Sequence, residues 1–307
     1  MEQIVEFLKT MIGVWPTAVR SPANQCVFAF LVLLLVLDIA RKGWRLSWSR
    51  LAVQSVAATI AIFNINLVLA PTIWLLSDQI KALYALAGIP SIPTSAWSAF
   101  PVWALMIIAI VAHDFANYWN HRLMHMKWLW PVHAIHHSDP HVNALSAYRI
   151  HALETLVMWG SYTILLTWLG LPADAIGMGA VILVLHTIYV HVDVDWDHGP
   201  FRLLIASPRF HRWHHANVPE AYGKNLANVF PFFDRVFGTY HVPGPCTAPM
   251  GANDVPQNDV VRLTLWPVLE WTRLTLEQIG ILRGRIGNMS RRDATLPGQH
   301  MAKVDAE

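Results

Sequence analysis

Long apolar segments separated by short polar ones dominate the pattern of this sequence. Each segment is close to the roughly 20 residues that an α-helix needs to cross a bilayer. Any one of them would also suit a buried helix of a soluble protein, but five in one chain indicate a membrane protein. The five segments cover about residues 24–40, 52–76, 101–119, 153–170 and 174–191.

Interruptions in this pattern predict how the helices are arranged. The turn at residues 170–172, Gly-Leu-Pro, is so short that we expect the last two segments to form a tight helical hairpin. Asn64 and Pro71 lie inside the second segment and indicate a kink, or a helix packed within a bundle. Residues 258–286 are amphipathic around Pro267, which predicts a membrane-surface helix or one that packs against the rest of the protein.

We therefore predict an all-α integral membrane helical bundle of about four to five spans, with a helical cap on the cytoplasmic side. Residues 1–99 form the N-terminal spans, 100–243 a histidine-rich region that includes the hairpin, and 244–307 an amphipathic segment with a polar tail. The cytoplasmic side follows from the basic residues. If the spans alternate, 19 of the 22 Lys and Arg share one side, which the positive-inside rule makes cytoplasmic.

The composition agrees with a membrane protein and excludes several other classes. Hydrophobic residues make up 54% of the chain and charged residues only 14%, against about 25% charged in soluble domains. A formal net charge of +2, without a Lys/Arg block, excludes a nucleic-acid partner. Cys26 and Cys246 are two isolated thiols, which excludes a disulfide framework and a Cys-x-x-Cys metal site. The first residues lack a basic region and a cleavage site, so we expect no cleaved signal peptide.

Three histidine motifs are the candidate chemistry. One has the spacing H-x3-H and two have the spacing H-x2-H-H, and on a helix residues three and four apart share one face. Eight imidazoles are too many for one ion and suit two neighbouring metals with four to five ligands each. They are His121, His125, His133, His136, His137, His211, His214 and His215.

The residues around these motifs bear on which metal binds and what holds its ligands. Imidazole suits zinc, copper, iron and nickel alike. A position at the bilayer surface favours iron, because attack on an inert lipid C–H bond needs an oxidant made from dioxygen, whereas zinc has no redox chemistry. A ligating histidine also needs a partner for its second nitrogen. The acidic candidates near the motifs are Asp114, Asp139, Glu154, Asp193, Asp195, Asp197 and Asp234.

The order and spacing of motifs over about residues 100–243 resemble the fatty acid hydroxylase / sterol desaturase superfamily of membrane di-iron enzymes. The matching motifs include Asn-His-Arg-Leu-Met-His at 120–125, His-Ala-Ile-His-His at 133–137 and His-Arg-Trp-His-His at 211–215. The resemblance implies that the eight box histidines bind two iron ions. It also implies a further ligand about twenty residues before the last box, where His191 stands.

Five other residues are candidates for supporting the ligands. Asp193 stands where the family often has Asn, and the family's Asn-Tyr-Gly is rearranged here as Tyr-Gly-Lys-Asn at 222–225, which leaves the substrate open. His186 lies about 140° around the helix from His191 and suits either a supporting or a core position. His151 matches a position seen in relatives. The supporting candidates are His151, His186, Asp114, Asp193 and Asn225.

Taken together, these observations predict an oxygen-dependent di-iron hydroxylase, a monooxygenase acting on a C–H bond of a membrane lipid. Desaturation of a lipid or sterol at the same site is one alternative, and a membrane metal-binding or transport protein is an alternative of another class. The sequence has neither a GxGxxG fingerprint nor the His-Pro-Gly-Gly of a fused cytochrome domain. We therefore expect molecular oxygen, a lipid from the bilayer and a separate ferredoxin- or cytochrome-type electron donor as partners. No catalytic residue beyond the ligands and no organic cofactor site is predicted.

Overall fold

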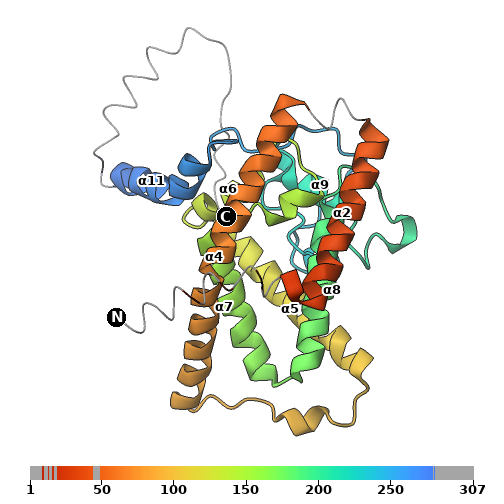
Figure 1. Ribbon diagram of the computed structural model, residues 1–307, viewed down its shortest axis with the longest axis vertical. Coiled ribbons are helices and arrows are strands. Elements are labelled where there is room, and N and C mark those ends of the chain that lie inside the picture. Colours follow the sequence, from red (N-terminus) through yellow and green to blue (C-terminus); the bar gives the residue numbers. More distant parts are fainter. Residues whose placement is uncertain are drawn as a thin grey trace. The chain divides into compact units, whose positions relative to one another are not determined.

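The computed structural model describes residues 19–43, 49–278 and 280, together with residues 9, 13 and 16. For 68–77 it describes the backbone alone. Over this part of the chain the protein is all-helical, as predicted, and its β-structure is one isolated bridge between Ala216 and Met250 (Figure 1). The chain forms two units, residues 1–266 and 267–307.

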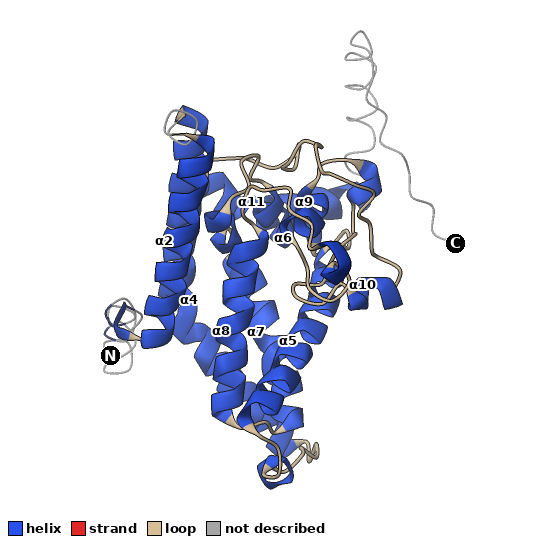
Figure 2. Cartoon of the chain, turned by 90° about the vertical axis from the view of Figure 1, so that its right-hand side faces the viewer, coloured by secondary structure: helices blue, strands red, loops and turns tan. Residues whose placement is uncertain are grey.

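Five long helices build the first unit. α5 packs against α7 and α8, α4 packs against α7, and α2 packs against α8 (Figure 2). Each of the five coincides with one of the predicted apolar segments. The helices are α2 (Pro22–Lys42), α4 (Arg50–Leu86), α5 (Val102–Met124), α7 (Ala152–Leu169) and α8 (Ala173–Val190).

Four stretches within these helices are long and apolar enough to cross a membrane. They are α2, α5, α8 and the part of α4 from Arg50 to Leu67. α7 falls outside the four, because its sequence mixes Glu154 and several hydroxyl side chains among the apolar ones. The described residues thus contain four of the predicted four to five spans. By the length and composition of its helices, the chain is an integral membrane protein.

The hairpin between α7 and α8 forms where the sequence predicts it. α7 ends at Gly170, whose φ of 59° is the left-handed conformation common at helix C-termini. A Cβ at this position would lie 1.9 Å from the carbonyl oxygen of Ile92, so the close approach also requires glycine. The Trp97 indole donates to the Leu169 carbonyl, and loop 87–101 therefore lies beside the hairpin.

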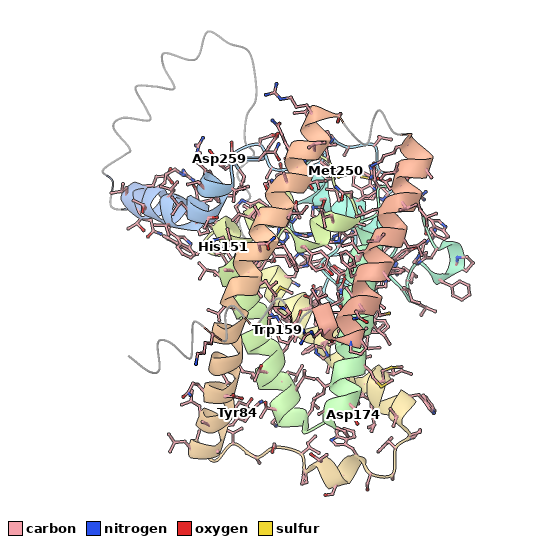
Figure 3. All side chains as sticks on the ribbon, viewed as in Figure 1. Tyr84, His151, Trp159, Asp174, Met250 and Asp259 are labelled. Atoms are coloured by element: carbon pink, nitrogen blue, oxygen red, sulfur yellow. The ribbon has the colours of Figure 1, made fainter. Side chains whose placement is uncertain are left out.

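Short helices cover the opposite end of the first unit. Figure 3 labels Tyr84 and Asp174 near the hairpin end and Met250 at the other end. The short helices are α6 (Trp130–His137), α9 (Pro208–His215) and α10 (Phe232–Val236), with 3₁₀ turns η2 (Ala144–Tyr148), η3 (Gly199–Phe201) and η4 (Pro219–Ala221), whereas η1 (Thr94–Trp97) lies in the loop at the hairpin end.

The amphipathic segment predicted at 258–286 forms α11 (Val260–Gln278), which contains Pro267 and crosses from the first unit into the second. In the first unit, Leu263 is buried against Ile62 and Ile135. In the second unit, Arg273 pairs with Glu270 and Glu277. The remainder of the predicted segment and the polar tail lie outside the described residues.

Candidate metal centre

Four helices of the first unit end at one place, and each ends in histidines. α6 and α9 are both eight residues long, have a proline in their first turn and carry an H-x2-H-H motif into their last turn. His191 is the C-cap of α8, and α5 carries His121 in its last turn and His125 as its C-cap. A helix C-terminus bears a partial negative charge, so four of them together favour a cation.

The nine histidines predicted as ligands lie in two groups. Within each group, one nitrogen from every member lies within 4.8 Å of the others. The structure therefore brings all nine together and divides them five and four. The first group is His121, His125, His133, His137 and His214, and the second group is His136, His191, His211 and His215.

Hydrogen bonds fix the ring tautomers in the first group. The Nδ1 of His121 donates to the Leu226 carbonyl at 2.7 Å, and the Nδ1 of His133 donates to the Glu154 carboxylate at 2.8 Å. Their Nε2 atoms therefore both carry lone pairs, yet they lie only 3.0 Å apart. Two acceptors that face each other without a proton between them repel, unless a cation lies beside both. This is the geometry of two ligands to one ion.

In the second group, a hydrogen bond fixes the tautomer of one ring, His191. The Nδ1 of His191 donates to the Thr187 carbonyl at 2.7 Å, which leaves the lone pair on Nε2. That Nε2 lies 3.2 Å from the Nε2 of His136 and 2.9 Å from the Nε2 of His211. In the first group, the Nε2 atoms of His125 and His214 are also buried without a hydrogen-bond partner among the described residues. Buried polar atoms are normally paired, so the unpaired nitrogens fit bound metal.

Burial keeps these imidazoles in the form that binds metal. Burial is the largest cause that lowers the pKa of the box histidines outside the spans well below 6.5, and repulsion between neighbouring rings lowers it further. Burial likewise lowers the pKa of His191 to about 4. A ligating histidine must be neutral, and these rings are neutral near pH 7. The donor set and its protonation state therefore fit a metal centre.

Glu154 supports the first group directly. It is buried in the first turn of α7, and its carboxylate accepts from the His133 ring. The sequence places it among seven acidic candidates but does not single it out. The other ring partners, the carbonyls of Leu226, Lys224 and Thr187, are backbone groups that any residue would supply. No side-chain signal in the sequence points to them.

Asp114 and Asn225 support the ligands through the loop that follows α9. The Asp114 carboxylate accepts from the backbone N–H groups of residues 228–230. The Asn225 amide donates to the carbonyls of Phe210 and His241, and its backbone has a φ of 57°. These contacts hold the loop whose carbonyls bind the rings of His121 and His214. Neither side chain bonds a ligand itself.

The remaining supporting candidates contact other parts of the protein. Asp193 forms ion pairs with Lys42 at 2.6 Å and with Arg212, while the His191 ring has the backbone partner Thr187. His151 caps α7, accepting from the Leu153 N–H and donating to the Thr264 carbonyl. His186 lies in α8 beside Tyr189, outside both histidine groups.

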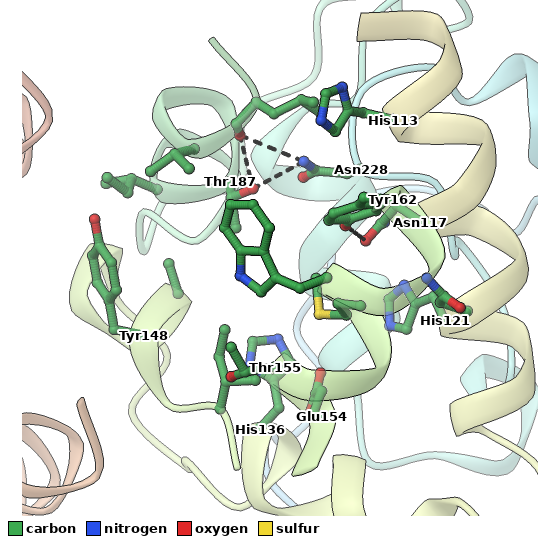
Figure 4. A pocket seen from close by; sticks show the side chains of 18 of the residues that line it. His113, Asn117, His121, His136, Tyr148, Glu154, Thr155, Tyr162, Thr187 and Asn228 are labelled. Carbon is green, nitrogen blue, oxygen red and sulfur yellow. Dashed lines mark hydrogen bonds between the residues drawn. The ribbon is translucent and has the colours of Figure 1, made fainter. Parts of the chain in front are cut away.

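An apolar cavity of about 570 Å³ leads from the histidines into the helix bundle. α4, α5, α7, α8 and η2 contribute its walls, which are mainly apolar and aromatic (Figure 4). Members of both histidine groups line one end. They are His121, His133, His136, His191 and His211.

The matches to known proteins fall in the region of the chain that contains the histidine groups. Residues 106–239 match the family model described as fatty acid hydroxylase. Over 145 residues the chain is 30% identical to alkylglycerol monooxygenase of Danio rerio, covering 47% of this chain and 31% of that protein. It is 32% identical over 146 residues to ornithine lipid hydroxylase OlsE of Rhizobium tropici, a match that covers 47% of this chain and 44% of that protein. It is 28% identical over 152 residues to methylsterol monooxygenase 2-2 of Arabidopsis thaliana, a match that covers 48% of this chain and 56% of that protein.

The first two of these matches span less than half of the relative's own length. No solved structure gives a significant match. The shared part nevertheless contains all three histidine boxes and His191. The family model and the named relatives place residues 106–239 of this chain, and not its whole length, in the fatty acid hydroxylase / sterol desaturase superfamily.

Proposed function

We propose that the chain is an oxygen-dependent hydroxylase that oxidises a C–H bond of a membrane lipid at two iron ions. One observation carries the proposal: two buried all-histidine groups lie at the head of an apolar cavity inside a bundle of membrane-length helices. The first group would hold one ion with five nitrogens, and the second would hold the other with four. Two irons, when bound, would supply the activation of dioxygen that oxidation of an unactivated C–H bond requires.

The chain's own residues would position the substrate and exclude water. Met124, Leu183 and Ile188 line the cavity and suit an acyl or ring-shaped hydrocarbon. Glu154 and the carbonyls of Leu226 and Thr187 hold the ligand rings in one tautomer, with Nε2 toward the ions. The buried site keeps bulk water from the reacting carbon.

Hydroxylation is favoured over the alternatives. The relatives reported above carry the names monooxygenase and hydroxylase, which favours oxygen insertion over desaturation at the same site. A metal transporter should place its ligands near the bilayer midplane, along a path across the membrane. Here the ligands lie at the ends of helices, beside an apolar cavity.

We further infer the position of the centre and its electron supply. The distribution of Lys and Arg supports a cytoplasmic position for the histidine-bearing end. A separate ferredoxin- or cytochrome-type donor would reduce the irons, because the 307 residues contain no dinucleotide or haem signature. The division into regions 1–99, 100–243 and 244–307 stays a prediction.

Comparative lipid profiling tests this function. Lipids from cells that express the chain should contain a species heavier by one oxygen, absent from cells that express the His136→Ala variant. A species lighter by two hydrogens would instead support desaturation. If iron and a reductant are supplied and neither species appears in any lipid class, the proposal of lipid oxidation is wrong.

A further inference from the structure

Polar side chains interrupt the apolar wall of the cavity at a distance from the histidine groups. His113 and Asn117 lie on α5, eight and four residues before His121, and all three line the cavity. At 1.5 Å per residue, these positions are about 12 and 6 Å from His121 along the helix. Figure 4 shows His113, Asn117 and Tyr162 gathered on one wall, apart from His136 and Glu154.

His113 presents an unused acceptor. Its Nδ1 donates to the Ala109 carbonyl at 2.8 Å, so its Nε2 carries a lone pair. The side chain is only 4% exposed, and its ring packs edge-on against Tyr162 with centroids 5.3 Å apart. Among the described residues, none donates a hydrogen bond to this Nε2. An ionisable side chain in a membrane-spanning helix is costly and, as a rule, serves a function.

Asn117 presents an unused donor beside it. The Tyr162 hydroxyl donates to the Asn117 Oδ1 at 2.9 Å, which orients the amide and leaves its Nδ2 group free. No described residue accepts a hydrogen bond from that Nδ2. A polar pair that served only to join helices would use its hydrogen bonds on α7 or α8. Here one acceptor and one donor remain, one helical turn apart, on the wall of the same cavity.

We propose that His113 and Asn117 form a subsite for a substrate group that both donates and accepts a hydrogen bond. The hydroxyl and the secondary amide are two lipid groups of this kind that stay uncharged near neutral pH. The group would donate to the His113 Nε2 and accept from the Asn117 Nδ2. The inference rests on the proposed function, since it takes the cavity to be the substrate site. It specifies that the oxidised carbon and the polar group are separated by about 6 to 12 Å, the axial spacing between these residues and His121.

Ligand displacement tests the subsite without turnover. The purified full-length protein, as isolated with its metal, is loaded with cis-parinaric acid, a fluorescent fatty acid. It is then titrated with octadecanoic acid, with a series of its monohydroxylated positional isomers, and with a fatty-acid chain interrupted by a secondary amide. We expect at least one isomer, or the amide, to displace the probe about tenfold better than octadecanoic acid, because it pairs two buried groups.

Variants separate recognition from packing. His113→Leu and Asn117→Leu should lose the preference, whereas His113→Gln, which keeps an acceptor, should retain part of it. Met158→Leu, an apolar change in the same cavity, should leave it intact. If the polar probes and octadecanoic acid displace equally well, or if His113→Leu keeps the preference, the subsite proposal is overturned. Because displacement needs no oxidation, a preference without lipid product would instead contradict the proposed function alone.

Discussion

The two histidine groups differ in how far along the chain their supporting contacts reach. In the first group, the ring of His121 bonds a carbonyl 105 residues away, and the ring of His133 bonds a carboxylate 21 residues away. In the second group, the ring of His191 bonds a carbonyl of its own helix, four residues back. The first group therefore depends on how a distant loop and α7 are packed, whereas His191 is oriented by α8 itself.

This difference suggests that the two ions would respond differently to changes around them. A change at Glu154 of α7 should affect the first group, whereas the loop after α9 also contacts Thr187 and Phe210 beside the second group. A change in a ligand should affect whichever group contains it. Matched variants therefore separate the two groups.

Removal of one ligand from each group should have the largest effect. His214→Ala and His136→Ala should both abolish lipid oxidation, because each removes a nitrogen from a buried site. Metal analysis of the purified variants should show that His214→Ala loses the ion of the first group first. The His136→Ala variant should lose the ion of the second group first. His141→Ala changes an exposed histidine outside both groups and serves as the control. Full metal content in either ligand variant would contradict the assignment of that ligand.

Removal of metal should make the stability of the protein depend on pH. Burial lowers the pKa of the ligands well below 6.5, whereas in the unfolded chain they titrate near that value. Below about pH 6.5 the unfolded state takes up more protons than the folded state, so the stability of the metal-free protein falls as the pH is lowered. Each fully shifted histidine would contribute up to about 1.4 kcal/mol per pH unit.

Thermal unfolding of metal-free and metal-loaded protein between pH 7.5 and 5.5 measures this effect. We expect a falling midpoint in the metal-free protein and a flatter curve in the loaded one, because bound metal competes with protons. Burial lowers the pKa of ligands in both groups, so a ligand variant from either group should reduce the slope. A flat curve without metal would show that the rings are not buried as neutral imidazoles.

Replacement of the Glu154 carboxyl should weaken the first group by a smaller factor. Glu154→Gln keeps an acceptor for the His133 ring but replaces the carboxyl with an amide, and changes to such partners typically cost 10–100-fold in affinity or activity. Asp174→Asn is a matched control, since Asp174 is the acidic residue in the first turn of α8, at the hairpin end (Figure 3). Metal titration should show weaker binding for Glu154→Gln only. Equal metal affinities in the two variants would show that Glu154 does not support the metal centre.

The same contrast explains how much of the site could be predicted from the sequence. The spacing of the box histidines is a helical signal, and α6 and α9 place them together because each is a local structure with a proline in its first turn. His191 required the resemblance to a family, because it is a single histidine without a spacing partner. The carbonyls of Leu226 and Lys224 leave no trace in the sequence. The sequence does not show that Asp193 pairs with Lys42 and Arg212, and its predicted support of His191 stays a prediction.

Asp193→Asn should have the smallest effect. Its carboxylate pairs with Lys42 of α2 and Arg212 of α9, and it is 31% exposed, so the ion pairs contribute about 0–1 kcal/mol. Metal affinity should therefore change by less than about threefold, with a small decrease in the thermal midpoint as the contact between α2 and α9 weakens. Lys42→Ala removes one of the two α2 partners of Asp193, the other being Arg41, and should give the same pattern or a weaker one. A loss of metal affinity of tenfold or more in Asp193→Asn, but not in Lys42→Ala, would show that Asp193 acts on His191 and that the second group also depends on contacts beyond its own helices.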